Sequence, residues 1–114
     1  SLPSNLKAGS TWTSKTDNDG ITKSTTYLVK EINGKMATIE LNGDMTTDTK
    51  MENQGMEITT KTTGKFSGEE TVDINTGVIL QNNTTMDASG NISVLGQEIP
   101  TKVNATTTTH VKSM

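Results

Sequence analysis

Histidine is the side chain that most often acts in acid–base catalysis, and it is scarce in this chain. His110 is the only histidine among 114 residues and lies close to the end of the sequence. A single histidine acts in a triad only beside a nucleophile and an orienting acid. His110 falls on the polar side of the last predicted strand, so we interpret it as a solvated surface residue. The absence of cysteine excludes thiol catalysis, disulfides and cysteine-based zinc sites in this chain.

The tightest acidic group consists of Glu69, Glu70 and Asp73. In a strand, Glu69 and Asp73 would lie on the same face, two pleats apart, and a glycosidase pair is conceivable at such a separation. Sugar sites usually add aromatic platforms, however, and this chain has only three aromatic residues. We therefore interpret the group as part of a solvated face. We expect no catalytic residue and no enzyme.

The segment Asp17-Asn18-Asp19-Gly20 has the alternating oxygen ligands and the glycine of a calcium loop. An EF-hand aligned on that glycine would need an oxygen ligand at position 15 and a glutamate at position 26, which are Lys15 and Thr26 here. A polar hairpin turn accounts for the segment fully. The sequence therefore predicts no metal site and no cofactor.

Methionine is a frequent apolar residue in this chain. Methionine is adaptable and polarizable, so it could line a groove for a lipid or another hydrophobic ligand, or simply fill gaps in a core poor in aromatic residues. We favour gap filling and keep the groove as the alternative. The six methionines are Met36, Met45, Met51, Met56, Met86 and Met114.

Charge and hydropathy narrow the possible partners. The chain has 10 basic and 13 acidic residues, a net charge of −3 and no arginine. Nucleic acid is therefore an unsuitable partner, because neutralising phosphates requires clustered cations. No apolar run is long enough for a membrane-spanning segment. Hydrophobic residues make up only 29%, yet the low net charge and regular alternation favour a folded domain over disorder.

Alternating polar and apolar residues predict an all-β fold. Glycine beside asparagine or aspartate recurs at the spacing of consecutive hairpins. No segment keeps a helical period, so no substantial helix is expected. Strands this long must twist and curl, which predicts a strongly curved antiparallel meander, or an up-and-down barrel or half-barrel, of about eight to nine strands. The expected strands are 10–16, 21–32, 35–42, 45–52, 56–63, 66–74, 78–86, 91–95 and 99–112.

Threonine occupies part of the face that should form the core. The chain contains 23 threonines, and threonine is a β-branched residue that suits a pleated strand. Those on the inward face line a wet or ligand-holding concavity, or belong to strand ends that run past the core. These inward threonines are Thr60, Thr62, Thr101, Thr107 and Thr109.

The order of the turn and strand motifs resembles a known family. It is similar to DUF6263, a family of exported Bacteroidetes-type proteins, lipoproteins among them, of unknown function. The resemblance implies an envelope location and a curved antiparallel sheet, and it implies no activity and no functional residues. Gly9-x-x-Trp12 before a meander is also suggestive of lipocalin-like barrels. The motifs that carry the first resemblance are Gly9-Ser10-Thr11-Trp12, Thr26-Tyr27-Leu28-Val29, Gly34-Lys35-Met36-Ala37-Thr38-Ile39, Gly64-Lys65-Phe66-Ser67-Gly68, Val72-Asp73-Ile74-Asn75-Thr76-Gly77 and Gly96-Gln97-Glu98-Ile99-Pro100.

Taken together, the sequence predicts a single non-enzymatic domain, 1–114, of an extracytoplasmic protein. The domain would belong to the periplasm or the cell surface, with a lipid anchor upstream as one option, and could be one part of a longer exported protein. We expect it to bind a hydrophobic or polymeric ligand, or a partner protein, on its curved sheet. The alternative is a structural or assembly module that pairs through exposed strand edges.

Overall fold

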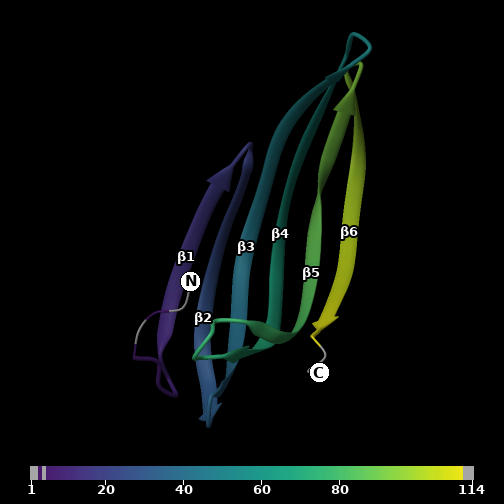
Figure 1. Ribbon diagram of the computed structural model, residues 1–114. Helices are drawn as coiled ribbons and strands as arrows, with labels where there is room; N and C mark the ends of the chain where they lie inside the picture. Colours follow the sequence, from purple (N-terminus) through teal and green to yellow (C-terminus); the bar gives the residue numbers. More distant parts are fainter. Residues whose placement is uncertain (1–2, 4, 112–114) are drawn as a thin grey trace.

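The computed structural model describes residues 3 and 5–111, and these form one antiparallel sheet (Figure 1). Its strands follow one another in chain order, each paired with the next. The all-β prediction is therefore confirmed, and no helix occurs among these residues. The strands are β1 (Thr11–Asn18), β2 (Ile21–Asn33), β3 (Met36–Asn53), β4 (Met56–Asp73), β5 (Ile79–Val94) and β6 (Gln97–His110).

Three of the hairpins close through two-residue turns in which both residues have positive φ. These turns are Asp19-Gly20, Gln54-Gly55 and Leu95-Gly96. Two positive φ values are the mark of a type I′ turn, whose twist matches that of the flanking strands. The β4–β5 connection is longer: the Asp73 carboxylate accepts hydrogen bonds from the backbone N–H of Asn75 (2.9 Å) and of Thr76 (3.2 Å). Gly77 then takes the left-handed conformation that the sequence predicted there.

The predicted count of eight to nine strands is wrong, because three of the expected breaks between strands lie inside strands. The expected breaks near Gly43, Gly64 and Gly90 fall within β3, β4 and β5. None of these glycines has positive φ. Atoms of the adjacent strand occupy the place of a side chain instead: a Cβ on Gly64 would lie 2.7 Å from the Ala88 Cβ atom. Glycine serves close packing here, so three pairs of expected strands merge into three long ones. The expected strands 35–42 and 45–52 form β3, 56–63 and 66–74 form β4, and 78–86 and 91–95 form β5.

The sheet is open, which corrects the prediction of a barrel or half-barrel. β1 and β6 are its two edges and do not pair with each other. The molecule measures 56 × 29 × 20 Å, and its radius of gyration is 17.7 Å. A compact domain of this length would have a radius of gyration of about 13 Å. The described chain is thus an elongated single layer without a second layer packed across it.

A small hydrophobic core sits at one end of the sheet. It consists of Val29, Ala37, Ile39 and Val72, all at most 1% exposed. The pairing register explains the clustering: Ile39 lies opposite Val29 on β2, and Ala37 lies opposite Val72 on β4. β2 and β4 therefore bring their apolar residues to the same side of β3.

Other segments of the chain cover the sheet at the end where the core lies. The β4–β5 loop folds across this face in front of β2 and β3 (Figure 1). It is fixed there by the backbone N–H of Ile74, which donates to the Lys35 carbonyl at 2.8 Å. Ile74, Ile32, Trp12, Tyr27 and Leu6 pack against the core.

The described residues contain no helix that is both long and apolar enough to cross a membrane.

Candidate functional site

The two faces of the sheet differ sharply in charge. Cross-strand partners share a face, so the register assigns each strand residue to a side. One side carries the core residues, together with Phe66, Met86, Ile92 and others, and we call it the apolar face. Among the strand residues that the structure describes, Lys23 and Glu70 are the only charged residues that the register places on it. Depletion of charge is typical of the centre of a binding interface.

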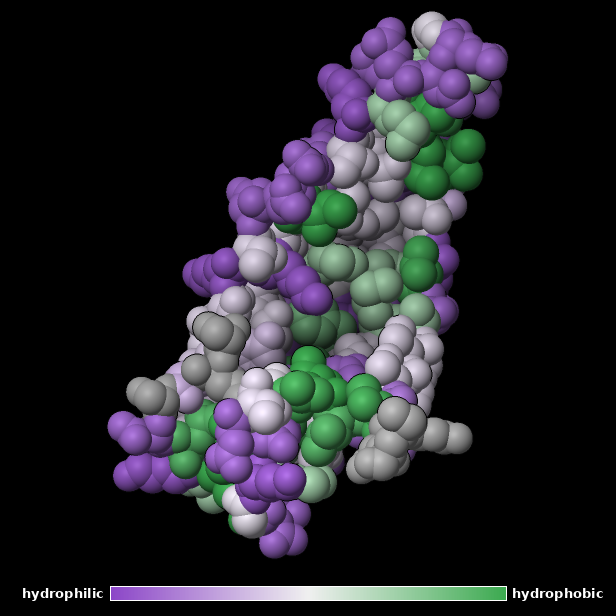
Figure 2. Space-filling view, in the orientation of Figure 1, coloured by the Kyte–Doolittle hydropathy of each residue, from purple (hydrophilic) through white to green (hydrophobic). Residues whose placement is uncertain are grey.

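The apolar face continues far beyond the small core. At the end away from the core it carries a set of large apolar side chains that no other part of the described chain covers. Figure 2 shows this stretch as green atoms among paler ones along the face. We call it the distal face, and it comprises Met51, Ile58, Ile92, Val94, Ile99 and Val103. Met51 is 64% exposed, Ile99 is 52% exposed and Val103 is 42% exposed, so the free apolar surface lies on β6 and near the end of β3.

A groove of about 690 Å³ opens at the core end of the apolar face. Trp12 and Tyr27, paired across β1 and β2, form one wall, with their rings stacked 5.0 Å apart at 13°. Thr76, Gly77 and Ile79 form the opposite wall. Val72 and Glu70 of β4 also line the groove. We call this cavity the Glu70 groove.

Glu70 is the buried carboxylate of the site, at 9% exposure. Its Oε2 atom accepts a hydrogen bond from the Asn82 side-chain amide at 3.1 Å. Asn82 is held in turn by Thr84, whose hydroxyl donates to the Asn82 Oδ1 atom at 2.7 Å. This series of hydrogen bonds from Thr84 through Asn82 to Glu70 therefore orients the amide donors of Asn82 toward the carboxylate.

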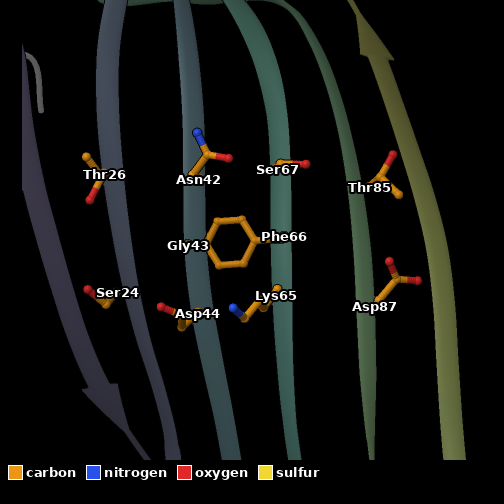
Figure 3. Close-up of a pocket in the computed structure, with 10 residues that line it drawn as sticks. All are labelled: Ser24, Thr26, Asn42, Gly43, Asp44, Lys65, Phe66, Ser67, Thr85 and Asp87. Atoms are coloured by element: carbon orange, nitrogen blue, oxygen red, sulfur yellow. The ribbon is translucent and has the colours of Figure 1, made fainter.

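The polar face carries a separate open hollow of about 460 Å³ (Figure 3). Asp44, Lys65 and Asp87 are register partners across β3, β4 and β5, so two acids flank one lysine. Gly43 and Phe66 also line this hollow, but the Phe66 ring lies on the opposite, apolar face, in the space that a side chain on Gly43 would fill. Within residues 3 and 5–111, no three His, Cys, Asp or Glu side chains come together as a metal site would require. The hollow offers mixed charge and no assembled chemistry.

The structure does not gather the sequence-predicted residues into one site. His110 ends β6, is exposed and pairs with Gln81, as expected for a solvated residue on the polar face. Asp17 and Asn18 end β1, and Asp19-Gly20 form the turn, so the polar hairpin turn is confirmed. Lys112 and Met114 lie outside the described residues.

The prediction for the acidic group was right for Glu69 and wrong for Glu70. Glu69 is exposed and forms an ion pair with Lys30 at 3.3 Å. Asp73 is half-buried and anchors the β4–β5 loop. Glu70 points to the opposite side and is buried. Simple alternation from Val72 would have placed Glu70 on the apolar face, and sequence reasoning missed that signal.

The methionines and inward threonines divide by position along the sheet. Met45 and Met86 lie half-buried on the apolar face, whereas Met36, Met51 and Met56 sit exposed at strand ends. Among the inward threonines, Thr60, Thr62 and Thr101 are half-buried, and Thr107 and Thr109 are exposed. All five belong to parts of β4 and β6 outside the core. Thr60, Thr62 and Thr101 lie where the strands run past the core, which was one of the two readings of the threonine pattern, whereas the register places Thr109 level with Ile39, on the edge strand β6.

Comparison with known proteins identifies a family without a known activity. No curated protein and no solved structure matches the chain significantly. A family model described as a family of unknown function, DUF6263, matches residues 2–79. The match extends through β1, β2, β3, β4 and the β4–β5 loop, and thus includes the core and all the residues that line the Glu70 groove. Because the match covers more than half of the sequence, the chain belongs to the DUF6263 family.

Proposed function

We propose that this protein is a non-enzymatic binding domain that docks its distal face onto a hydrophobic ligand or a partner protein. The observation that carries the proposal is the charge-depleted, uncovered stretch of the apolar face. Exposed apolar patches of this kind, rimmed by polar residues, mark interaction sites in soluble proteins. Covering Ile99 and Val103 would remove apolar area from water at a gain of about 25 cal/mol per Å².

Docking by the face is better supported than pairing through a strand edge. β6 is a long edge strand, but it carries Pro100 and Lys102. In the β5–β6 hairpin, Val94 and Gln97 flank the two-residue turn and form a hydrogen-bonded pair. Hydrogen-bonded pairs then recur at every second residue, so the residues of β6 at odd positions bond to β5. Those at even positions direct their backbone N–H and C=O groups outward, away from the sheet. Pro100 therefore removes an outward N–H from that edge. Proline and lysine are devices that discourage edge-to-edge pairing.

The compartment is a further part of the proposal. We infer an extracytoplasmic location from the cysteine-free, threonine-rich composition and from the exported proteins that the sequence resembles. Fractionation of cells that express the full gene from its own promoter tests this part. Recovery of the protein with the cytoplasmic fraction would refute it.

A neutral hydrophobic dye, Nile red, tests the distal face. Wild-type protein should bind the dye with enhanced dye fluorescence, and Val103→Glu should weaken binding by about fivefold or more, because a charge there must be desolvated. Asn104→Glu is the matched control: it adds the same charge one residue away on the polar face of β6. It should change affinity by less than about twofold, since a solvated charge there touches no apolar surface.

Equal weakening by both variants would show that only net charge matters. That result, or wild-type protein that binds no dye, would contradict the proposed docking face. Circular dichroism of both variants should remain that of the wild type, because Val103 and Asn104 are both exposed.

A further inference from the structure

We propose that the Glu70 groove is a binding site for a small organic cation, an ammonium group carried on an apolar body. The site lies at the core end of the sheet and does not depend on whether the distal face docks a partner. Its three components are a cavity of suitable size, an aromatic wall and a buried carboxylate without a cationic partner.

The cavity has the dimensions and lining of a small-molecule site. Ligand pockets typically measure about 300–1,000 Å³ and combine apolar walls with a few polar groups. The groove measures about 690 Å³. Ile79, which is 46% exposed, provides aliphatic surface, and the hydroxyls of Ser14 and Thr76 provide hydrogen-bonding groups.

The charge of the groove selects the class of ligand. Within the described part of the chain, the ion pairs involve Glu69, Asp73 and Glu57, and none involves Glu70. Its hydrogen bond comes from a neutral amide. A carboxylate that is buried without a cation carries an uncompensated desolvation cost. A ligand ammonium placed in the groove would supply the missing charge.

The aromatic wall favours the same class of ligand. Trp12 and Tyr27 present π systems, and cations are attracted to the faces of such rings, most strongly to that of tryptophan. The rings also provide flat apolar surface for the body of the ligand. The sheet already pairs a cation with a ring elsewhere, since the Lys23 ammonium lies 4.8 Å from the centroid of Phe66.

Titration with benzylammonium and with benzyl alcohol, a neutral molecule of similar size, tests the site. Trp12 is the only tryptophan, so its fluorescence reports on this groove alone. Wild-type protein should bind benzylammonium about tenfold or more tightly than benzyl alcohol, because a hydrogen bond to a charged group contributes more than one between neutral groups. Glu70→Gln, which keeps an oxygen that can accept from Asn82, should abolish that preference.

Glu69→Gln is the matched control, since it removes the same charge from the adjacent residue on the opposite face. It should leave the preference within about twofold of wild type, because it lies outside the groove. Equal binding of the two compounds by wild-type protein would overturn the proposal without any variant. So would a preference that persists in Glu70→Gln, or one that Glu69→Gln removes equally. A failure here leaves the dye result at the distal face unaffected, so the two proposals are separable.

Discussion

Replacing Ile39 with alanine should lower the free energy of unfolding by about 3 kcal/mol, within the range found for truncation of buried aliphatic side chains. Ile39 is fully buried, and it is one of only four residues that form the core. The β4–β5 loop that covers this core is held by the hydrogen bond from Ile74 to the Lys35 carbonyl, so it can move little to fill the cavity. The loss should appear as a lower urea midpoint in a denaturation curve followed by circular dichroism.

Ile99→Ala is the control for this substitution, because it removes the same atoms from a site that is 52% exposed. Its cost should be below about 1 kcal/mol, since little apolar surface returns to water there. If the two substitutions cost the same, the core is not concentrated at the end of the sheet where Ile39 lies.

Gly90→Val should destabilise the protein by more than about 2 kcal/mol, or prevent folding, because its side chain would overlap neighbouring backbone. A Cβ on Gly90 would overlap the backbone carbonyl oxygen of Lys61 and lie 2.6 Å from the Thr62 Cα atom. Both atoms belong to β4, whose distance from β5 is fixed by the hydrogen-bonded ladder. Intrinsic strand propensity predicts the opposite sign, since valine favours strands and glycine does not.

Ser89→Val provides the comparison for Gly90→Val. Ser89 is the preceding residue, is exposed and lies on the polar face. Valine there should change the free energy of unfolding by less than about 0.5 kcal/mol, as is usual for surface sites. Thermal unfolding of both variants decides the matter: a Gly90→Val protein as stable as wild type would contradict the close approach of β4 and β5.

The hairpin turns could be predicted from the sequence because their chemistry is local. Asp19-Gly20 and Gly77 need positive φ, and the residue types alone indicate this. The interior glycines could not be separated from turn glycines in the same way. Gly43 is required because the Phe66 ring of β4 packs over it, and that contact depends on a register between residues far apart in the sequence.

The closure of the sheet and the burial of Glu70 depend on similarly non-local facts. Strand length predicts twisting, but whether β1 pairs with β6 depends on how the twist and stagger of all six strands add up across the sheet. The sheet remains open. Alternation assigns Glu70 to the apolar face, whereas its burial depends on β5 and on the loop that forms a wall of the groove. The sequence could therefore predict which face of the sheet a residue lies on better than it could predict which segments cover that residue.

Thiol labelling tests the central claim, that the distal face of the protein is open and available for binding. The chain has no cysteine, so Val103→Cys, Asn104→Cys and Ala37→Cys each introduce one thiol. For the monomer, we predict that Val103→Cys reacts with a neutral maleimide within about threefold of the rate of Asn104→Cys, while fully buried Ala37→Cys reacts at least about a hundredfold more slowly. If Val103→Cys were as protected as Ala37→Cys, the distal face would be covered within the protein itself, and the account would be contradicted.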